Sequence, residues 1–173
     1  MNCNNTDCIK NPNISIRPYR EQDFQRLCEI HDPARRNELE LAGLSAAFLP
    51  LTIAAEREGL FEYQLYVAEF GGTVAGFAAF TEDELAWLYV DVEMTRHGIG
   101  SSLIAYALDK MSDDVSVEVL VSNAPAIAVY SSFGFVIEKT ITGVMPGNEE
   151  FAVKVHVMKW VDNAGNKQML WDI

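Results

Sequence analysis

The sequence predicts a single α/β domain with a mixed central β-sheet of about six or seven strands, flanked by about four helices. Its 173 residues suit one domain, and 49% hydrophobic with 22% charged residues is ordinary for a globular protein. Strand-like and helix-like periods alternate along the chain, with both hairpins and longer crossovers. We expect residues 14–173 to form this domain. Residues 1–13 are rich in Asn and lack periodicity, so we expect a flexible N-terminal tail there.

The first part of the domain is predicted to hold one strand and then two or three helices. Alternation over residues 14–19 favours a strand, and apolar residues at helical spacing favour a helix over 21–30. We expect Pro33 to end that helix and to begin a second one that runs towards Gly43. A third helix is predicted around residues 51–59.

The second part shows clearer boundaries. Gly71-Gly72 predicts a hairpin turn between two strands, and the mostly apolar residues 85–90 predict a buried strand. A one-sided apolar pattern predicts the helix that begins at Ile99. The predicted strands are 64–70, 73–81, 85–90, 116–121, 135–142 and 151–160, and the predicted helices begin at Ile99 and near Pro125.

Charge and composition exclude several classes of protein. The formal net charge of −12 disfavours binding to nucleic acid or to anionic membranes, and it tolerates cationic small substrates such as amines. No apolar run reaches the length of a membrane span. The polar start of the chain does not resemble a signal peptide, so we expect a cytoplasmic protein.

The cysteines give no sign of a disulfide framework or a metal site. Cys3, Cys8 and Cys28 are odd in number in a chain without a predicted signal peptide. Cys28 and His31 have the spacing of half a zinc site, but the other ligands would have to come from the N-terminal tail. We therefore expect no metal.

A Gly-x-Gly loop precedes the helix that begins at Ile99. Gly98 and Gly100 leave the backbone open, and the unpaired N–H groups of the first helical turn attract a phosphate. Ser101 and Ser102 add hydroxyl donors, and Arg96 adds positive charge. An ordinary tight turn is the alternative. A Walker-type loop is excluded because no Gly-x4-Gly-Lys-Ser/Thr occurs, and a dinucleotide fingerprint fails because residue 103 is Leu.

A second pattern runs from Asn123 to Phe135. Asn123 is placed to cap the helix that follows it, and Gly134 suits the end of that helix. Tyr130 lies two helical turns after Asn123, so both can face one cleft. Core packing of Tyr130 is the alternative.

Together the two stretches resemble the GNAT superfamily of acetyl-CoA-dependent N-acetyltransferases. The family's Arg/Gln-x-x-Gly-x-Gly/Ala loop is similar to residues 95–100, which follow Leu-Tyr-Val-Asp-Val-Glu at 88–93. Its later Asn-x-x-Ala-x-x-Phe-Tyr-x-x-x-Gly-Phe motif is similar to residues 123–135. Thr95 and Val92 depart from the family's usual Arg/Gln and Pro, so we expect backbone N–H groups to carry the pyrophosphate.

The resemblance implies where coenzyme A binds. The backbone of residues 88–90 would pair with the pantetheine arm between two splayed strands, and residues 97–102 would hold the pyrophosphate. Asn123 would touch the arm, and the Tyr130 hydroxyl would lie near the sulfur. The implied cofactor-binding residues are Leu88, Tyr89, Val90, Arg96, His97, Gly98, Ile99, Gly100, Ser101, Ser102, Asn123 and Tyr130.

Direct acetyl transfer to an amine needs a base and an acid. The resemblance implies Tyr130 as the general acid that protonates the departing thiolate. For the base we favour Glu84, which lies four residues before Leu88 at a position where several family members carry Glu. The alternative is that Glu82, Asp83 and Glu84 form a solvated link. His97 lies in the phosphate loop and is a weaker candidate.

The resemblance implies an N-acetyltransferase that uses acetyl-CoA, and two other functions can be compared with it. A catalytically weak coenzyme A-binding sensor is the main alternative. A serine hydrolase, suggested by Gly43-Leu44-Ser45-Ala46-Ala47, lacks the second Gly of a nucleophile elbow. The acceptor is a small-molecule or peptide amine whose identity the sequence does not give. We expect residues 31–63 to shape its pocket, and we expect a homodimer.

Overall fold

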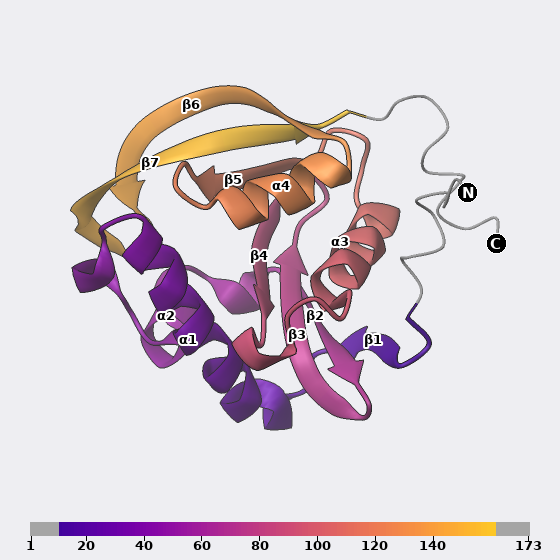
Figure 1. The fold of residues 1–173 in the computed structure, drawn as a ribbon. Helices are drawn as coiled ribbons and strands as arrows, with labels where there is room; N and C mark the ends of the chain where they lie inside the picture. The colour runs from indigo at the N-terminus through magenta and orange to yellow at the C-terminus, as the bar shows by residue number, and fades with distance from the viewer. Residues whose placement is uncertain (1–10, 162–173) are drawn as a thin grey trace.

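The structure is a computed structural model that describes residues 11–161. Within this range the chain forms seven strands in two antiparallel sheets, together with four α-helices (Figure 1). This arrangement confirms the predicted mixed α/β fold. Most of the predicted N-terminal tail and the end of the predicted domain, residues 1–10 and 162–173, lie outside the described residues.

The first sheet has four strands in the order β1-β2-β3-β4. Gly71 and Gly72, with φ of +58° and +83°, make the predicted hairpin turn between β2 and β3. β3 is buried along almost its whole length, because helices cover both faces of the sheet. The strands are β1 (Ile14–Pro18), β2 (Gln64–Phe70), β3 (Thr73–Phe80) and β4 (Leu85–Val90).

The second sheet has three strands in the order β5-β7-β6: β5 (Ser116–Leu120), β7 (Asn148–Trp160) and β6 (Phe135–Met145). β6 and β7 form a long hairpin that arches over one end of the molecule (Figure 1). Both strands extend beyond the predicted 135–142 and 151–160. Because Pro146 and Gly147 alone separate the strands, the ladder continues almost to the tip.

The two sheets touch where β4 and β5 begin. A single parallel bridge joins Glu84 to Ser116. After this point β4 pairs with β3, and β5 pairs with β7, so the facing edges of β4 and β5 are unpaired within the described residues.

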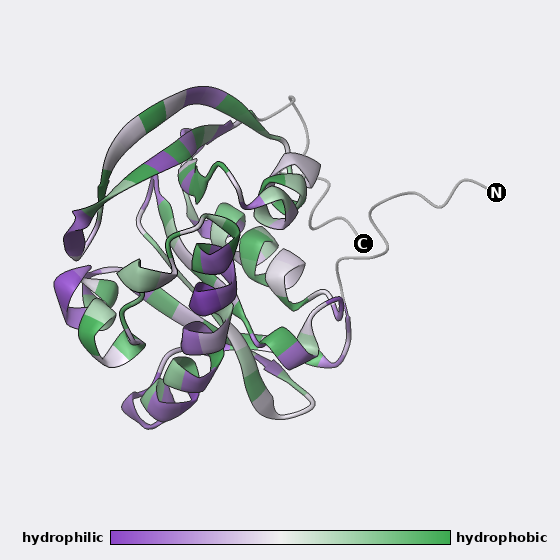
Figure 2. Ribbon diagram, turned by 60° about the vertical axis from the view of Figure 1, so that its left-hand side comes forward, coloured by the Kyte–Doolittle hydropathy of each residue, from purple (hydrophilic) through white to green (hydrophobic). Residues whose placement is uncertain are grey.

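Two helices cover each side of this framework. α1 (Phe24–Leu41) and α2 (Leu51–Arg57) pack with Phe77 and Trp87 on one face of the first sheet. α3 (Ile99–Lys110) packs with Phe80 on the other face, and α4 (Ala124–Ser132) joins the same core through Tyr130. Most residues of α1 are hydrophilic, as the purple colour along its ribbon shows (Figure 2).

The predicted helix break at Pro33 is wrong. α1 continues through Pro33, although proline has no N–H to donate to the carbonyl of Glu29. Buried side chains before and after Pro33, including Ile30 and Leu39, pack on the core and hold both halves of the helix in line. Asp32 does not help to end a helix, as was predicted. Its Oδ1 instead accepts the N–H of Leu51 at 2.9 Å and fixes the start of α2 to α1.

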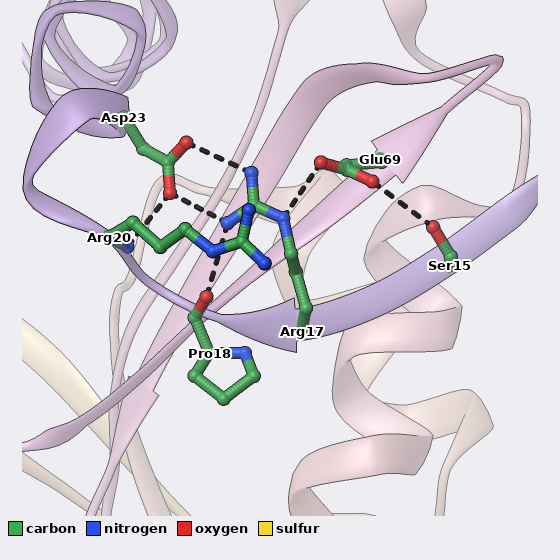
Figure 3. Close-up of polar contacts among 6 residues, drawn as sticks. All are labelled: Ser15, Arg17, Pro18, Arg20, Asp23 and Glu69. Atoms are coloured by element: carbon green, nitrogen blue, oxygen red, sulfur yellow. Dashed lines mark hydrogen bonds and ion pairs between the residues drawn. The ribbon is translucent and has the colours of Figure 1, made fainter.

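Arg17 fixes the start of α1 to the first sheet (Figure 3). Its guanidinium donates to both carboxylate oxygens of Asp23, at 2.7 and 2.9 Å, and to Glu69 at 2.7 Å. Asp23 is buried, and the hydrogen bonds from Arg17 lower the pKa of its carboxyl group. This contact joins β1, β2 and the residues that lead into α1.

Candidate active site

A cleft of about 360 Å³ lies where β4 and β5 diverge. Strands from both sheets form its walls, α1 and α4 close its sides, and the tip of the β6–β7 hairpin lies at one end. The charged, tyrosine and amide side chains in its lining are those of Arg35, Glu38, Glu58, Tyr63, Glu84, Tyr89, Glu118, Asn123 and Tyr130.

Residues 88–90 of β4, which were predicted to bind the pantetheine arm, line this cleft. Leu88 and Val90 pack towards the core beneath α3, whereas Tyr89 packs on the opposite face beside α1. The Tyr89 ring meets the ring of buried His31 edge-on, with 4.7 Å between centroids. The unpaired strand edge is suited to add an extended ligand through backbone hydrogen bonds.

The Gly-x-Gly loop has the backbone of an anion site. Gly98 is the N-cap of α3 and has φ of +83°, and the first helical bond runs from the N–H of Ser102 to its carbonyl at 2.9 Å. The N–H groups of Ile99, Gly100 and Ser101 therefore have no partner within the helix. A Cβ at Gly100 would lie at an ordinary contact distance of 3.5 Å from Val90, so the packing of the protein does not itself require glycine there.

Side chains of this loop contribute less than its backbone. The Ile99 side chain is buried in the core. The His97 ring turns back, with Nδ1 at 3.0 Å from the carbonyl of Thr95 and its ring against Phe70. Arg96 adopts φ of +66°, a left-handed conformation that is uncommon outside glycine. None of residues 96–102 lines the cleft itself; the loop follows the end of β4.

Tyr130 is buried at the wall of the cleft. It is 6% exposed and meets the Phe135 ring edge-on at 5.6 Å between centroids. Burial, with a smaller effect from Glu38, raises the pKa of its hydroxyl well above the usual value. Tyr130 therefore keeps its proton at neutral pH, as a general acid must before it acts.

Asn123 confirms the predicted helix cap, because its Oδ1 accepts the N–H of Ala126 at 3.2 Å. Its Nδ2 donates to Glu38 Oε1 at 3.3 Å and links α4 to α1. Both polar atoms of this side chain thus have protein partners. The expected contact between Asn123 and the pantetheine arm stays a prediction.

Glu84 lines the cleft at the bridge between the sheets. Its N–H donates to Thr81 Oγ1 at 3.1 Å, which fixes the backbone before β4. Burial, and then the charges of Glu118 and Asp83, raise the pKa of its carboxyl group, and an interaction with Tyr63 opposes this rise. A carboxylate of raised pKa is a stronger base than an ordinary surface glutamate.

Five of these lining side chains were not identified from the sequence: Arg35, Glu38, Glu58, Tyr63 and Glu118. The first four lie in residues 31–63, the segment predicted to shape the acceptor pocket. Arg35 and Glu38 form an ion pair of 2.6 Å, and Tyr63 interacts with Glu84. The i,i+3 spacing of Arg35 and Glu38 is also typical of a solvated helix face. The sequence therefore does not distinguish them from the other charged residues of α1, and only the folded structure shows that they line the cleft.

Neither a metal site nor a membrane helix was found in the described part of the chain. Among residues 11–161, no three His, Cys, Asp or Glu side chains come together in a way that could hold a metal ion. Cys28 is a free thiol, while Cys3 and Cys8 lie outside the described residues. No described helix is both long enough and apolar enough to cross a membrane.

Several known proteins with a similar sequence or fold carry the name acetyltransferase. The protein named "Uncharacterized N-acetyltransferase YafP" from Escherichia coli is 29% identical over 126 residues, which cover 71% of this chain and 81% of that protein. A GCN5-related N-acetyltransferase from Rhodopseudomonas palustris matches the fold with a TM-score of 0.68 and 20% identity, over 84% of this chain and 94% of that one.

A third match carries a ligand. The yncA protein of Salmonella typhimurium, solved with its cofactor acetyl-CoA, has a TM-score of 0.56 and 18% identity over 88% of this chain and 96% of its own. The sequence profile of the Acetyltransferase (GNAT) family matches residues 24–135, which include β4, the Gly-x-Gly loop and Tyr130. With the diverging strands and the helix-capping loop in place, this match shows that the chain belongs to the GNAT family of acetyltransferases.

Proposed function

We propose that this protein transfers an acetyl group from acetyl-CoA to an amine, directly and without an acyl-enzyme. One observation carries the proposal: the unpaired edge of β4 runs from a cleft containing Tyr130 and Glu84 to the open helix N-terminus at Gly98. This layout suits a long ligand with a reactive group at one end and phosphates at the other. The yncA structure holds acetyl-CoA on the same fold.

The chain's residues fit coenzyme A in two places. Backbone groups of residues 88–90 would pair with the amide-containing arm, since the neighbouring edge of β4 is free. The first-turn N–H groups of α3 would take the pyrophosphate, because they combine free donors with the positive end of the helix dipole. The glycines at 98 and 100 leave that surface free of side-chain atoms.

Two side chains would transfer protons during the reaction, one as the general base and one as the general acid. Glu84 would take a proton from the acceptor's ammonium group, and its raised pKa makes it a stronger base for this task. As the amine nitrogen bonds to the acetyl carbon and the carbon–sulfur bond breaks, Tyr130 would give its proton to the sulfur. The second proton lost by nitrogen returns through solvent to Tyr130. The products are an N-acetyl amide, coenzyme A thiol and one released proton.

The test is amine-dependent release of coenzyme A. Purified protein would be mixed with acetyl-CoA and a panel of amines, and free thiol measured with and without each amine. We expect release well above the amine-free rate for at least one acceptor, and Glu84→Gln should lower kcat for it by 10²–10⁴-fold. Binding of acetyl-CoA without release for any amine would favour a coenzyme A sensor instead.

A further inference from the structure

Glu58 is a half-buried carboxylate in the cleft that neither the GNAT motifs nor the proposed acid and base account for. It follows α2 directly and lines the cleft on the side of α1 and α2. Among residues 11–161 no hydrogen bond or ion pair reaches its carboxylate. A half-buried charge without a partner is costly for the fold, so such groups are often functional.

The tip of the β6–β7 hairpin fixes the position of Glu58. Gly147 has φ of +71°, and a Cβ there would lie 3.0 Å from Glu58 Cγ, so the bare glycine backbone packs directly on this side chain. Arg57 donates to the carbonyl of Gly147 at 3.0 Å, and Asn148 donates to the carbonyl of Ala47 at 3.0 Å. The hairpin is thus attached to the helices at the point where Glu58 enters the cleft.

The charges around Glu58 leave an excess of negative charge. The lining of the cleft includes one arginine and four glutamates. Arg35 pairs with Glu38 at 2.6 Å and also donates to Met145 Sδ at 3.7 Å, so it does not pair directly with Glu58. Burial raises the pKa of Glu58 to about 7, against the opposing effect of Arg35. The groups whose charges act on Glu58, or on which it acts, are Arg35 and Glu38 from α1, Tyr63 before β2, Tyr89 from β4 and Glu149 from β7.

We propose that Glu58 is a specificity residue that binds a second cationic group of the acceptor, so that the preferred acceptors are diamines. This proposal rests on the proposed acetyl transfer and names its acceptor class. One amine reacts beside Glu84 and Tyr130, while the other pairs with the Glu58 carboxylate. The pair forms best when Glu58 is ionised, so preference for a diamine rises between pH 6 and pH 8.

Matched acceptors and matched variants test the proposal. kcat/KM is measured for 1,4-diaminobutane and for n-butylamine, which differ by one amino group. In the wild type the diamine should be preferred at least tenfold at pH 8, and Glu58→Gln should reduce that ratio at least tenfold. Glu56→Gln is the control, because Glu56 is exposed on α2 and does not line the cleft. It should leave the ratio unchanged.

Binding of the same two amines, measured by calorimetry in the presence of coenzyme A, gives a readout that needs no turnover. Weaker diamine binding in Glu58→Gln, but not in Glu56→Gln, supports the subsite even if no acetylation occurs, and the proposed transfer then fails alone. Equal binding of both amines by the wild type, or equal losses for both in Glu58→Gln, overturns the subsite while acetylation can still be observed.

Discussion

Arg26 of α1 and Asp91, the residue after β4, form an ion pair that ties the helix to the segment that leads into the Gly-x-Gly loop. Arg26 also donates to the carbonyl of Val74 at 2.9 Å. The Asp91 carboxylate accepts the N–H of Glu93 at 2.9 Å, and the Asp91 N–H donates to Ala75 at 2.8 Å. Asp91 is buried, so loss of Arg26 would leave a buried carboxylate without its ion-pair partner.

Arg26→Met should therefore destabilise the protein and weaken cofactor binding together. We expect a loss of about 1–3 kcal/mol in the free energy of unfolding, because the Asp91 carboxylate keeps its burial and loses its counter-charge. Denaturant unfolding and acetyl-CoA calorimetry measure the two effects. In the double variant with Asp91→Asn, the losses should be smaller than the sum of the single variants. Additive losses would show that the ion pair does not couple the two residues.

Substitutions at Gly100 and Gly76 should have different effects. The first should weaken acetyl-CoA binding, and the second should lower the thermal stability of the fold. A Cβ at Gly100 would meet only Val90, at an ordinary 3.5 Å, so Gly100→Val should keep the fold but crowd the N–H groups of α3. Acetyl-CoA affinity should fall at least tenfold with little change in Tm. A Cβ at Gly76 would lie 2.9 Å from both the Tyr89 carbonyl and Ile99, so Gly76→Ala should lower Tm. Unchanged acetyl-CoA affinity in folded Gly100→Val would remove this loop from the binding site.

The sequence predicted the fold well wherever local patterns and tertiary packing agree. β2 and β4 have the predicted bounds, because glycines or charged residues interrupt the apolar runs there. Pro33 misled the prediction, since its local preference for ending a helix is weaker than the packing of α1 on the sheet. The division into two sheets also has no local signal, as it depends on which strand edges meet.

Some residues of the candidate site could be predicted from local motifs, and others could not. Gly98, Asn123 and Tyr130 stand at fixed spacings within contiguous motifs, so their places could be predicted. Glu58 follows α2, which is distant in sequence from β4, and its position depends on contact with Gly147 across 89 positions of the chain. No periodicity in the sequence reports such a contact.

The expected homodimer would use β6, which is the edge strand of the second sheet. Val136, Ile137, Ile141 and Val144 are between 38% and 56% exposed, which is an unusual amount of apolar surface for an edge strand left in water. Light scattering should give about twice the 19.3 kDa chain mass, and Ile141→Lys should shift it towards one chain. A single-chain mass at every concentration would contradict the dimer.

Glu58 should make stability depend on pH in a specific direction. Its pKa is raised from 4.5 to about 7 in the folded protein, so its stabilising contribution is complete below pH 4.5 and is lost as pH rises through 7. Glu58→Gln removes this loss and should raise stability at pH 8 by about 1–2 kcal/mol after allowance for solvent screening, with little gain at pH 5. Thermal unfolding at both pH values checks the difference. An equal change at both would show that Glu58 does not titrate in this range.

Tyr130→Phe tests the general acid, because it removes only a hydroxyl group from a buried ring. The contact with Phe135 depends on the ring, so the fold and the affinity for acetyl-CoA should survive. Loss of a general acid costs about 10²–10⁴-fold in rate, so kcat should fall while KM for acetyl-CoA moves little.

The pH profile separates this role from simple packing. A thiol has a pKa of about 8.5, so the departing sulfur needs a proton least at high pH, and the defect of Tyr130→Phe should shrink between pH 6 and pH 9. If Tyr130 only fills the core, the variant should keep kcat within about threefold of the wild type at every pH. Steady-state rates at saturating acetyl-CoA over this range decide between the two, because packing alone gives no reason for the defect to follow the protonation of the leaving group.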